Sequence, residues 1–314
     1  MAKLTIDGLK TFCQTYVASA KQAGVWADST ENLLGLIDKV GMQITLDGSF
    51  QDKLPELDGN DLPLGKTIEE WFIDLTLPQE YDENGANTMA PHYPSVEDAA
   101  YSYTLGRKTI ATTQPFDNVE RAAISAESAS NMIAKIMERL TNSATLYRYA
   151  VKKQLLGNFA TKAVAANRGQ VLAIPVNTET SEAFIKQVKQ DVEEASFASE
   201  NTSLGKALIG AAPELTLYVK KGVMPVVEVE ALAGTFHAEN LAIPATVKVV
   251  DDFGKADSNI YAMLIDPRGV KLHRGYHAVR EQLNGEGDFI NFYDHSEYSA
   301  FCSKHTFVKV YKAA

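Results

Sequence analysis

The sequence lacks the features that mark secreted, membrane and zinc-binding proteins. Cys13 and Cys302 are its only cysteines, which is too few for a disulfide framework or for a zinc site with cysteine ligands. No uninterrupted apolar run reaches the roughly 18 residues of a membrane-spanning helix, and the N-terminal segment MAKLTIDGLK lacks the apolar core of a secretion signal. We therefore expect a protein that folds in the cytoplasm and has no membrane partner.

An excess of positive charge is missing too. The chain carries 30 Lys and Arg residues against 40 Asp and Glu residues, a formal net charge of −10. Proteins that grip nucleic acid gain affinity by neutralising phosphates with Lys and Arg, so this balance argues against such a task. With 45% hydrophobic and 22% charged residues the composition is that of a globular protein. A chain of 314 residues usually divides into two lobes.

Residues 62–81, LPLGKTIEEWFIDLTLPQEY, are the most informative stretch. The Gly-Lys-Thr at 65–67 matches the end of a phosphate-binding loop, in which successive backbone N–H groups surround phosphates. The upstream glycine, Gly59, leaves five intervening residues where the pattern has four, and Pro63 removes one of the N–H groups. The spacing therefore argues against a nucleotide site.

Alternation of side-chain types favours a strand in this stretch. Trp71 and Ile73 fall on one side, Glu70 and Phe72 fall on the other, and the run is rich in aromatic and β-branched residues. A second alternating run at 101–105 follows the polar segment QEYDENGANTMAPHYP. Together the two runs predict a long β-hairpin with an extended tip.

The segment LPLGKTIEEWFIDLT followed by QEYD resembles the extended loop of the major capsid proteins of short-tailed phages of the phi-twenty-nine type. Those proteins have the Hong Kong 97 capsid fold. The resemblance therefore implies an α+β fold with an N-terminal arm, an extended β-hairpin loop, a peripheral domain with a long spine helix, and an axial domain. It also implies that the hairpin contacts a neighbouring subunit. The residues expected in that contact are Lys66, Glu69, Glu70, Trp71, Asp74 and Tyr81.

A long helix is the second expected feature. Asp117 and Glu120 have the spacing of a capping box, and no Pro or Gly occurs from there to Gly157. An apolar stripe along this segment keeps step with 3.6 residues per turn, which favours ordinary core packing over a coiled coil. In the capsid family this segment corresponds to the spine helix. The residues expected in its core are Met132, Ile133, Ile136, Leu140 and Tyr147.

Shorter elements are predicted on either side of the long helix. The two N-terminal helices, at 6–20 and 33–40, pack on their own subunit or, as the resemblance implies, form an arm along a shell. The other predicted elements are helices at 180–195 and from Pro225 onward, strands at 171–176, 215–219, 246–250, 261–265, 289–293 and 306–311, and a linker at 199–205. The expected domains are an N-terminal arm at 1–50, an extended loop at 51–114, a peripheral domain with the spine helix at 115–204, an axial domain at 205–300, and a C-terminal strand at 301–314 that returns to the peripheral domain.

Groups able to bind a metal are few. His273, His277 and Glu281 have a spacing that converges on a metal only in a helix. Gly275 interrupts the segment, and a strand and turn are expected there. We therefore expect these histidines at the surface or at an interface.

Catalytic groups are equally scarce. Cys302 and His305 resemble a nucleophile and a base, but no orienting third residue or oxyanion element is apparent. Cys302 is expected to pack as a small buried residue, and the acidic pairs at 193–194 and 251–252 are expected to be solvated. We therefore expect no catalytic site, no metal and no cofactor.

The expected function is that of a major capsid protein. The resemblance implies self-assembly into pentamers and hexamers of an icosahedral or prolate shell around phage double-stranded DNA, in the cytoplasm of a bacterial host. The net charge of −10 suits a wall that contacts packaged DNA non-specifically. A separate scaffolding protein, a portal, and minor capsid or decoration proteins are the other expected partners. Two alternatives stay open: an encapsulin-like nanocompartment shell that holds enzyme cargo, and a soluble α+β enzyme that depends on a metal or a nucleotide.

Overall fold

The computed structural model describes residues 51–62, 67–73, 91, 93–101, 104–115, 126–197, 214–234, 243–254 and 259–313. The predicted N-terminal helices and the predicted linker lie outside these residues. The chain divides into two compact units. The first comprises residues 1–53, 106–149 and 274–298, and the second comprises residues 54–105, 150–273 and 299–314.

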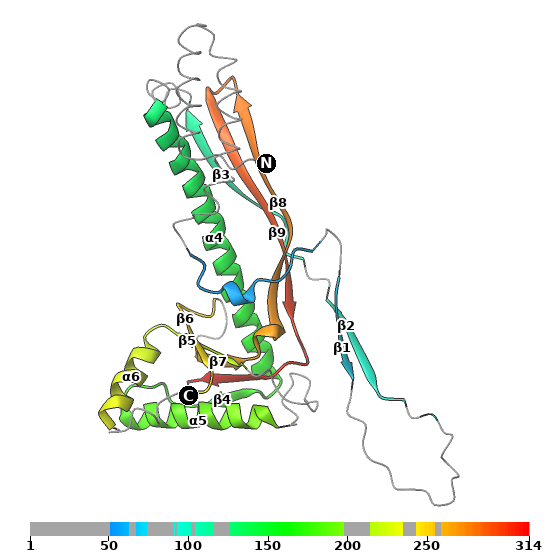
Figure 1. The fold of residues 1–314 in the computed structure, drawn as a ribbon, viewed down its shortest axis with the longest axis vertical. Coiled ribbons are helices and arrows are strands. Elements are labelled where there is room, and N and C mark those ends of the chain that lie inside the picture. The colour runs from blue at the N-terminus through cyan, green and yellow to red at the C-terminus, as the bar shows by residue number, and fades with distance from the viewer. Residues whose placement is uncertain are drawn as a thin grey trace, which may run out of the picture. The chain divides into compact units, whose positions relative to one another are not determined.

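The first unit is built on a three-stranded sheet in the order β3-β9-β8, formed by Lys108–Pro115, Phe289–Cys302 and Val270–Asn284. Strands β3 and β9 are antiparallel. Buried and half-buried residues alternate along β9, so one face of the strand points into a core. Figure 1 shows helix α4, Ala126–Ala165, alongside these strands. The ring of Tyr147 on α4 lies 6.2 Å from that of Tyr298 on β9.

Helix α4 confirms the long helix expected from the sequence. It has 40 residues, which corresponds to about 60 Å at 1.5 Å per residue. Ile136 and Leu140 are buried, and Tyr147 is half-buried, as the apolar stripe predicts. Met132 and Ile133 lie within the helix, and their place in its core remains a prediction.

The helix continues past Gly157. Gly157 is buried inside α4, where close packing outweighs the roughly 1 kcal/mol by which glycine disfavours a helix. The helix ends at Ala165, and Asn167 just beyond it has a φ of 60°. The Arg168 N–H donates to the Ala163 carbonyl at 2.8 Å, as in a Schellman cap. The predicted capping box at 117–120 lies outside the described residues.

The second unit contains a five-stranded mixed sheet in the order β4-β10-β7-β5-β6. These strands are Gly169–Val171, Val308–Lys312, Ile260–Ile265, Thr216–Lys220 and Thr246–Val250. Helices α5, Thr178–Ser196, and α6, Val223–Gly234, pack against the sheet (Figure 1). Their shared core includes Phe184, Val188, Val227, Leu217 and Tyr261. The strands predicted at 215–219, 246–250 and 261–265 are therefore confirmed to within a residue.

Some predicted bounds in this unit are wrong. The strand predicted at 171–176 ends at Val171, because its pairing with β10 runs only from Gly169 to Val171. Helix α5 begins at Thr178 rather than at 180 or 181. Asn177 is its N-cap: the Asn177 side-chain oxygen accepts a hydrogen bond from the Thr180 N–H at 2.9 Å. Helix α6 begins two residues before Pro225.

Strand β10 links two segments that the sequence assigns to different domains. Strand β10 pairs in parallel with β4, from the expected peripheral domain, and antiparallel with β7, from the expected axial domain. Strand β9 runs from Phe289 to Cys302 without a break at 300. The expected boundaries at 204/205 and 300/301, and with them the peripheral and axial domains, remain predictions.

Ile136 provides a test of the helix packing. Its side chain is only 6% exposed, so Ile136→Ala is expected to lower the free energy of unfolding by about 2 to 5 kcal/mol through lost burial and a residual cavity. Lys135, the exposed neighbour on the same helix, is the matched control, and Lys135→Ala is expected to change stability by less than about 0.5 kcal/mol. Urea unfolding of unassembled subunits measures both. Equal effects of the two substitutions would contradict this packing.

Candidate functional site

The stretch singled out in the sequence forms one strand of an antiparallel pair. Strands β1, Ile68–Ile73, and β2, Val96–Tyr101, pair from Ile68 opposite Tyr101 to Ile73 opposite Val96. We call this two-stranded sheet the β1–β2 pair. Both halves of the predicted hairpin contain a strand, as expected. The second strand, β2, ends at Tyr101, where the alternating run predicted at 101–105 begins. Lys66, Asp74 and Tyr81 lie outside the described residues.

One face of the β1–β2 pair, its inner face, packs against the end of β9 and the segment that follows it. Phe72 stacks on His305, with 4.6 Å between ring centroids and an angle of 7° between the planes. Tyr101 meets Phe301 edge-on at 5.0 Å. Because side chains alternate along a strand, Phe72 and Glu70 share this face. The β1–β2 pair therefore has a fixed base within its own chain.

Glu70 accepts the hydrogen bonds that hold this base together. Its carboxylate accepts hydrogen bonds from the Tyr101 hydroxyl at 2.7 Å, from the Ser303 hydroxyl, and from the Lys304 N–H at 3.4 Å. Burial and the Glu70 carboxylate raise the pKa of Tyr101, so its hydroxyl stays a donor across the physiological range. The carboxylate is thus used within the chain, and a contact of Glu70 with a neighbouring subunit remains a prediction.

The segment that leads into β1 also packs against its own chain, where it contacts helix α4. Leu54 and Leu57 are fully buried. The buried Lys152 ammonium donates to the Leu54 carbonyl at 2.8 Å and lies 2.7 Å from an Asp58 carboxylate oxygen. Burial of an ammonium is costly unless it is paired, and this segment supplies the Leu54 carbonyl and the Asp58 carboxylate as partners.

Lys152 was missed in the sequence. A signal was available, since Lys152 interrupts the apolar side of a long helix whose later residues Leu155 and Leu156 are buried. A lysine at a core position requires a partner, but the sequence does not say which acid or carbonyl supplies it.

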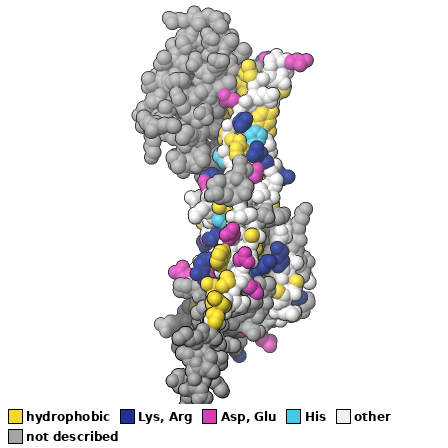
Figure 2. Space-filling model, turned by 90° about the vertical axis from the view of Figure 1, so that its right-hand side faces the viewer, with side chains coloured by type: hydrophobic (Ala, Val, Ile, Leu, Met, Phe, Trp, Pro, Cys, Tyr) yellow, Lys and Arg dark blue, Asp and Glu magenta, His cyan; other side chains and the backbone are white. Residues whose placement is uncertain are grey.

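The other face of the β1–β2 pair, its outer face, is apolar and exposed. Trp71 is 68% exposed, Ile73 55% and Val96 48%. Glu69 and Asp98 are exposed on the same face, and Asp98 lies opposite Trp71 in the register. Figure 2 shows hydrophobic side chains at the surface among acidic and basic ones on this side of the molecule. An exposed apolar cluster with a polar rim is typical of a protein contact.

The histidines and the cysteine considered as metal ligands or catalytic groups make contacts within the fold or are buried in it. His273 and His277 lie on strand β8, not on a helix. The His273 ring bonds the Asn60 carbonyl at 2.9 Å, and the His277 ring lies 3.3 Å from Asp294. Burial raises the pKa of the Cys302 thiol to about 12, so its nucleophilic thiolate is scarce at neutral pH. Among the described residues no group of three metal-ligating side chains comes together.

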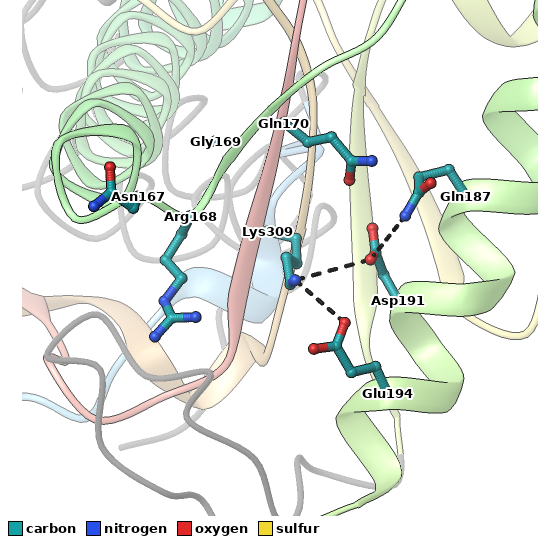
Figure 3. A pocket seen from close by; sticks show the side chains of 8 residues that line it. All are labelled: Asn167, Arg168, Gly169, Gln170, Gln187, Asp191, Glu194 and Lys309. Atoms are coloured by element: carbon teal, nitrogen blue, oxygen red, sulfur yellow. Dashed lines mark hydrogen bonds and ion pairs between the residues drawn. The ribbon is translucent and has the colours of Figure 1, made fainter.

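Asp251, Asp252 and Glu194 are solvent-exposed, as expected, and each also lies beside a lysine. Lys153 lies 2.7 Å from Asp251 and 3.0 Å from Asp252. Glu194, with Lys309 at 3.3 Å, lines an open pocket of about 330 Å³. In Figure 3 the Lys309 side chain points between Asp191 and Glu194, so the charges facing this pocket neutralise one another.

The described helices include none that is long and apolar enough to cross a membrane.

Comparison with known proteins decides between the interpretations left open by the sequence. The family model for Phi29-like phage major capsid proteins matches residues 25–310. The chain belongs to this family. One member, the major capsid protein of Bacillus phage PZA, is 22% identical over 286 residues, which are 87% of this chain and 62% of the PZA protein. The chain thus spans less than two thirds of the length of that relative.

Solved structures assign the fold of this Phi29-like chain. The capsid of Staphylococcus phage Andhra superposes with a TM-score of 0.66 at 12% identity, covering 84% of this chain and 85% of that one. The mature capsid of bacteriophage PhiM1 gives 0.57 at 8% identity, covering 84% and 88%. These proteins have the Hong Kong 97-type capsid fold, and the mixed helix and sheet arrangement described above is the same fold. The predicted fold class and the predicted family are confirmed.

The two faces of β1 can be separated by experiment. Phe72→Ala removes the contact with His305 and is expected to loosen β1 by about 1.4 kcal/mol, so that its amides exchange about tenfold faster. Trp71→Ala changes the exposed face and is expected to leave exchange in β1 within about twofold of the original. Hydrogen–deuterium exchange of unassembled subunits measures both. Faster exchange with Trp71→Ala than with Phe72→Ala would invert the assignment of the faces.

Proposed function

We propose that the chain is the subunit of a closed phage capsid shell, formed from pentamers and hexamers of itself around double-stranded DNA. The observation that carries the proposal is the two-faced β1–β2 pair. Its inner face is held by Glu70 and Phe72, while its outer face presents Trp71 and Ile73 to solvent. A strand pair with one fixed face and one open apolar face is built to receive a second molecule.

Energetics favour a neighbour on the outer face. A two-stranded sheet is only marginally stable alone, and each strand here pairs only with the other in the part of the chain that the structure describes. Covering apolar surface contributes about 25 cal/mol per Å², and a central aromatic anchor carries about 2 kcal/mol or more of association energy. A partner that covers Trp71 therefore stabilises both the contact and the strand pair.

Repeated contacts of one kind between subunits then produce a shell. The outer face of one subunit meets a different surface of the next, which is a heterologous contact, and such contacts close into rings when the rotation permits. Pentamers and hexamers are the rings that a closed shell requires. The net charge of −10 suits a wall that encloses DNA without adhering to it. A scaffolding protein, a portal and decoration proteins belong to the same proposal, as does assembly in the bacterial cytoplasm.

The experiment separates folding from assembly. The register places Ile73 opposite Val96, so replacing residues 74–95 by Asn-Gly joins the two strands with a two-residue turn. This shortened protein and a Trp71→Asp variant are expected to stay folded by circular dichroism. Both are expected to need at least about tenfold more protein to form shells, because about 1.4 kcal/mol lost at each contact is repeated around the shell. Sedimentation and electron microscopy count the shells.

Phe197→Asp is the matched control for Trp71→Asp. Phe197 is an aromatic residue with a similar exposure, 64% against 68%, at the C-terminus of α5. Its substitution is expected to leave the assembly concentration within about threefold of the original. Closed particles of the shortened protein at the original concentration would refute the role of the β1–β2 pair in assembly.

A further inference from the structure

The turn that joins β8 to β9 contains a reactive dipeptide. The two strands are neighbours in the three-stranded sheet (Figure 1), and the chain passes from Asn284, the last residue of β8, to Phe289, the first residue of β9, through Gly-Glu-Gly-Asp. Asn-Gly suits hairpin turns because glycine adopts conformations closed to other residues. The same dipeptide favours attack of the backbone nitrogen on the asparagine side chain, since glycine has no Cβ to hinder the approach. The turn therefore carries a chemistry that shell formation does not use.

The side-chain carbonyl of Asn284 is held by two backbone donors. The Glu286 N–H donates to Asn284 Oδ1 at 3.0 Å, and the Gly287 N–H donates to the same oxygen at 2.9 Å. Backbone donors that stabilise an oxyanion in acyl transfer act at about 2.7 to 3.1 Å. Because both donors withdraw electron density from the amide, they make its carbon, Cγ, more electrophilic.

The attacking nitrogen belongs to an open position. Gly285 is exposed, and apart from its chain neighbours no atom lies within 4 Å of the place that a Cβ on Gly285 would occupy. A ring that joins the Gly285 nitrogen to Cγ of Asn284 therefore has room to form on this side, and water has access to it.

We propose that Asn284 is a site of spontaneous modification, at which the folded chain converts its own asparagine into aspartate and isoaspartate. The Gly285 nitrogen gives its proton to solvent and adds to Cγ of Asn284. The carbonyl oxygen becomes an oxyanion, which the Glu286 and Gly287 N–H groups stabilise. The Cγ–Nδ2 bond then breaks, and ammonia leaves with a proton taken from water. Water opens the resulting cyclic imide, so the reaction consumes water, releases ammonia and requires no other reactant.

The two products change the turn in different ways. Opening of the ring at Cγ gives aspartate, whose carboxylate accepts the same two N–H bonds more strongly because it is charged. Opening at the main-chain carbonyl gives isoaspartate, in which the backbone runs through the former side chain and is longer by a methylene group. Glu286 and Asp288 are already in the turn, so either product adds a further negative charge beside them. The reaction involves a single chain and is independent of the proposed shell.

Peptide mapping by mass spectrometry tests the proposal on unassembled subunits held at neutral pH. We expect a growing fraction of Asn284 in which the amide NH2 is replaced by OH, and ion exchange is expected to resolve a species with one more negative charge. Asn291 on β9 is the control within the same chain. Its Oδ1 accepts a hydrogen bond from the Thr113 hydroxyl at 2.6 Å, and it precedes the buried Phe292. Asn291 is expected to stay unmodified.

Gly285→Ala is the variant that tests the attacking nitrogen. The added methyl group meets no atom outside the chain neighbours, so circular dichroism is expected to show an unchanged fold. The methyl group hinders ring closure, and conversion of Asn284 is expected to slow by at least about tenfold. Asn284→Asp provides the reference for the mass and charge of the aspartate product.

Urea measures what the fold contributes. The unfolded chain keeps the Asn-Gly at 284–285 and contains a second one at 84–85, which serves as an internal reference. In urea the two asparagines are expected to convert at similar rates. In the folded subunit Asn284 is expected to convert at least as fast as in urea, because only the folded turn aims two N–H donors at its carbonyl oxygen. Slower conversion in the folded subunit than in urea, or conversion of Asn284 no faster than that of Asn291, would overturn the proposal without affecting the proposed shell.

Discussion

The period of two in a β-strand is the constraint on which the functional surface depends. Because successive side chains point to opposite faces, one six-residue strand holds two sets of residues with opposite roles. Glu70 and Phe72 fasten β1 to the segment at 301–305, and Trp71 and Ile73 are thereby turned outward. A shift of register by one residue would bury the acid-flanked tryptophan and expose the anchors. The hydrogen bonds at Glu70 and the stacked rings of Phe72 and His305 oppose that shift.

The two sheets make this anchoring possible. Strand β9 ends at Cys302, and β10 begins at Val308 in the five-stranded sheet, so the segment between them is held at both ends. This segment supplies Ser303, Lys304 and His305 to the base of the β1–β2 pair. On the entry side, the buried Lys152 ties Leu54 and Asp58 to helix α4. The base of the β1–β2 pair is therefore held by contacts within its own unit, and its outer face has no partner among the described residues.

Sequence patterns predicted those features of the fold that depend only on residues close together in the chain. The alternation at 68–73 and the apolar stripe around Ile136 and Leu140 each follow from the period of one element, and both were confirmed. The contacts that join distant segments were not predictable. No local signal pairs Glu70 with Ser303 or Lys152 with Leu54. Strand β10 pairs with β4, from the expected peripheral domain, and also with β7, from the expected axial domain, and the second pairing was not predictable because sheet order is set by packing between distant segments.

Electron cryo-microscopy of the purified chain under assembly conditions tests the central claim most directly. We expect closed shells of pentamers and hexamers in which the outer face of the β1–β2 pair lies against a neighbouring subunit, with Trp71 enclosed at the contact. Shells in which Trp71 faces solvent, or a sample that stays monomeric or stops at two-fold symmetric dimers, would contradict the account.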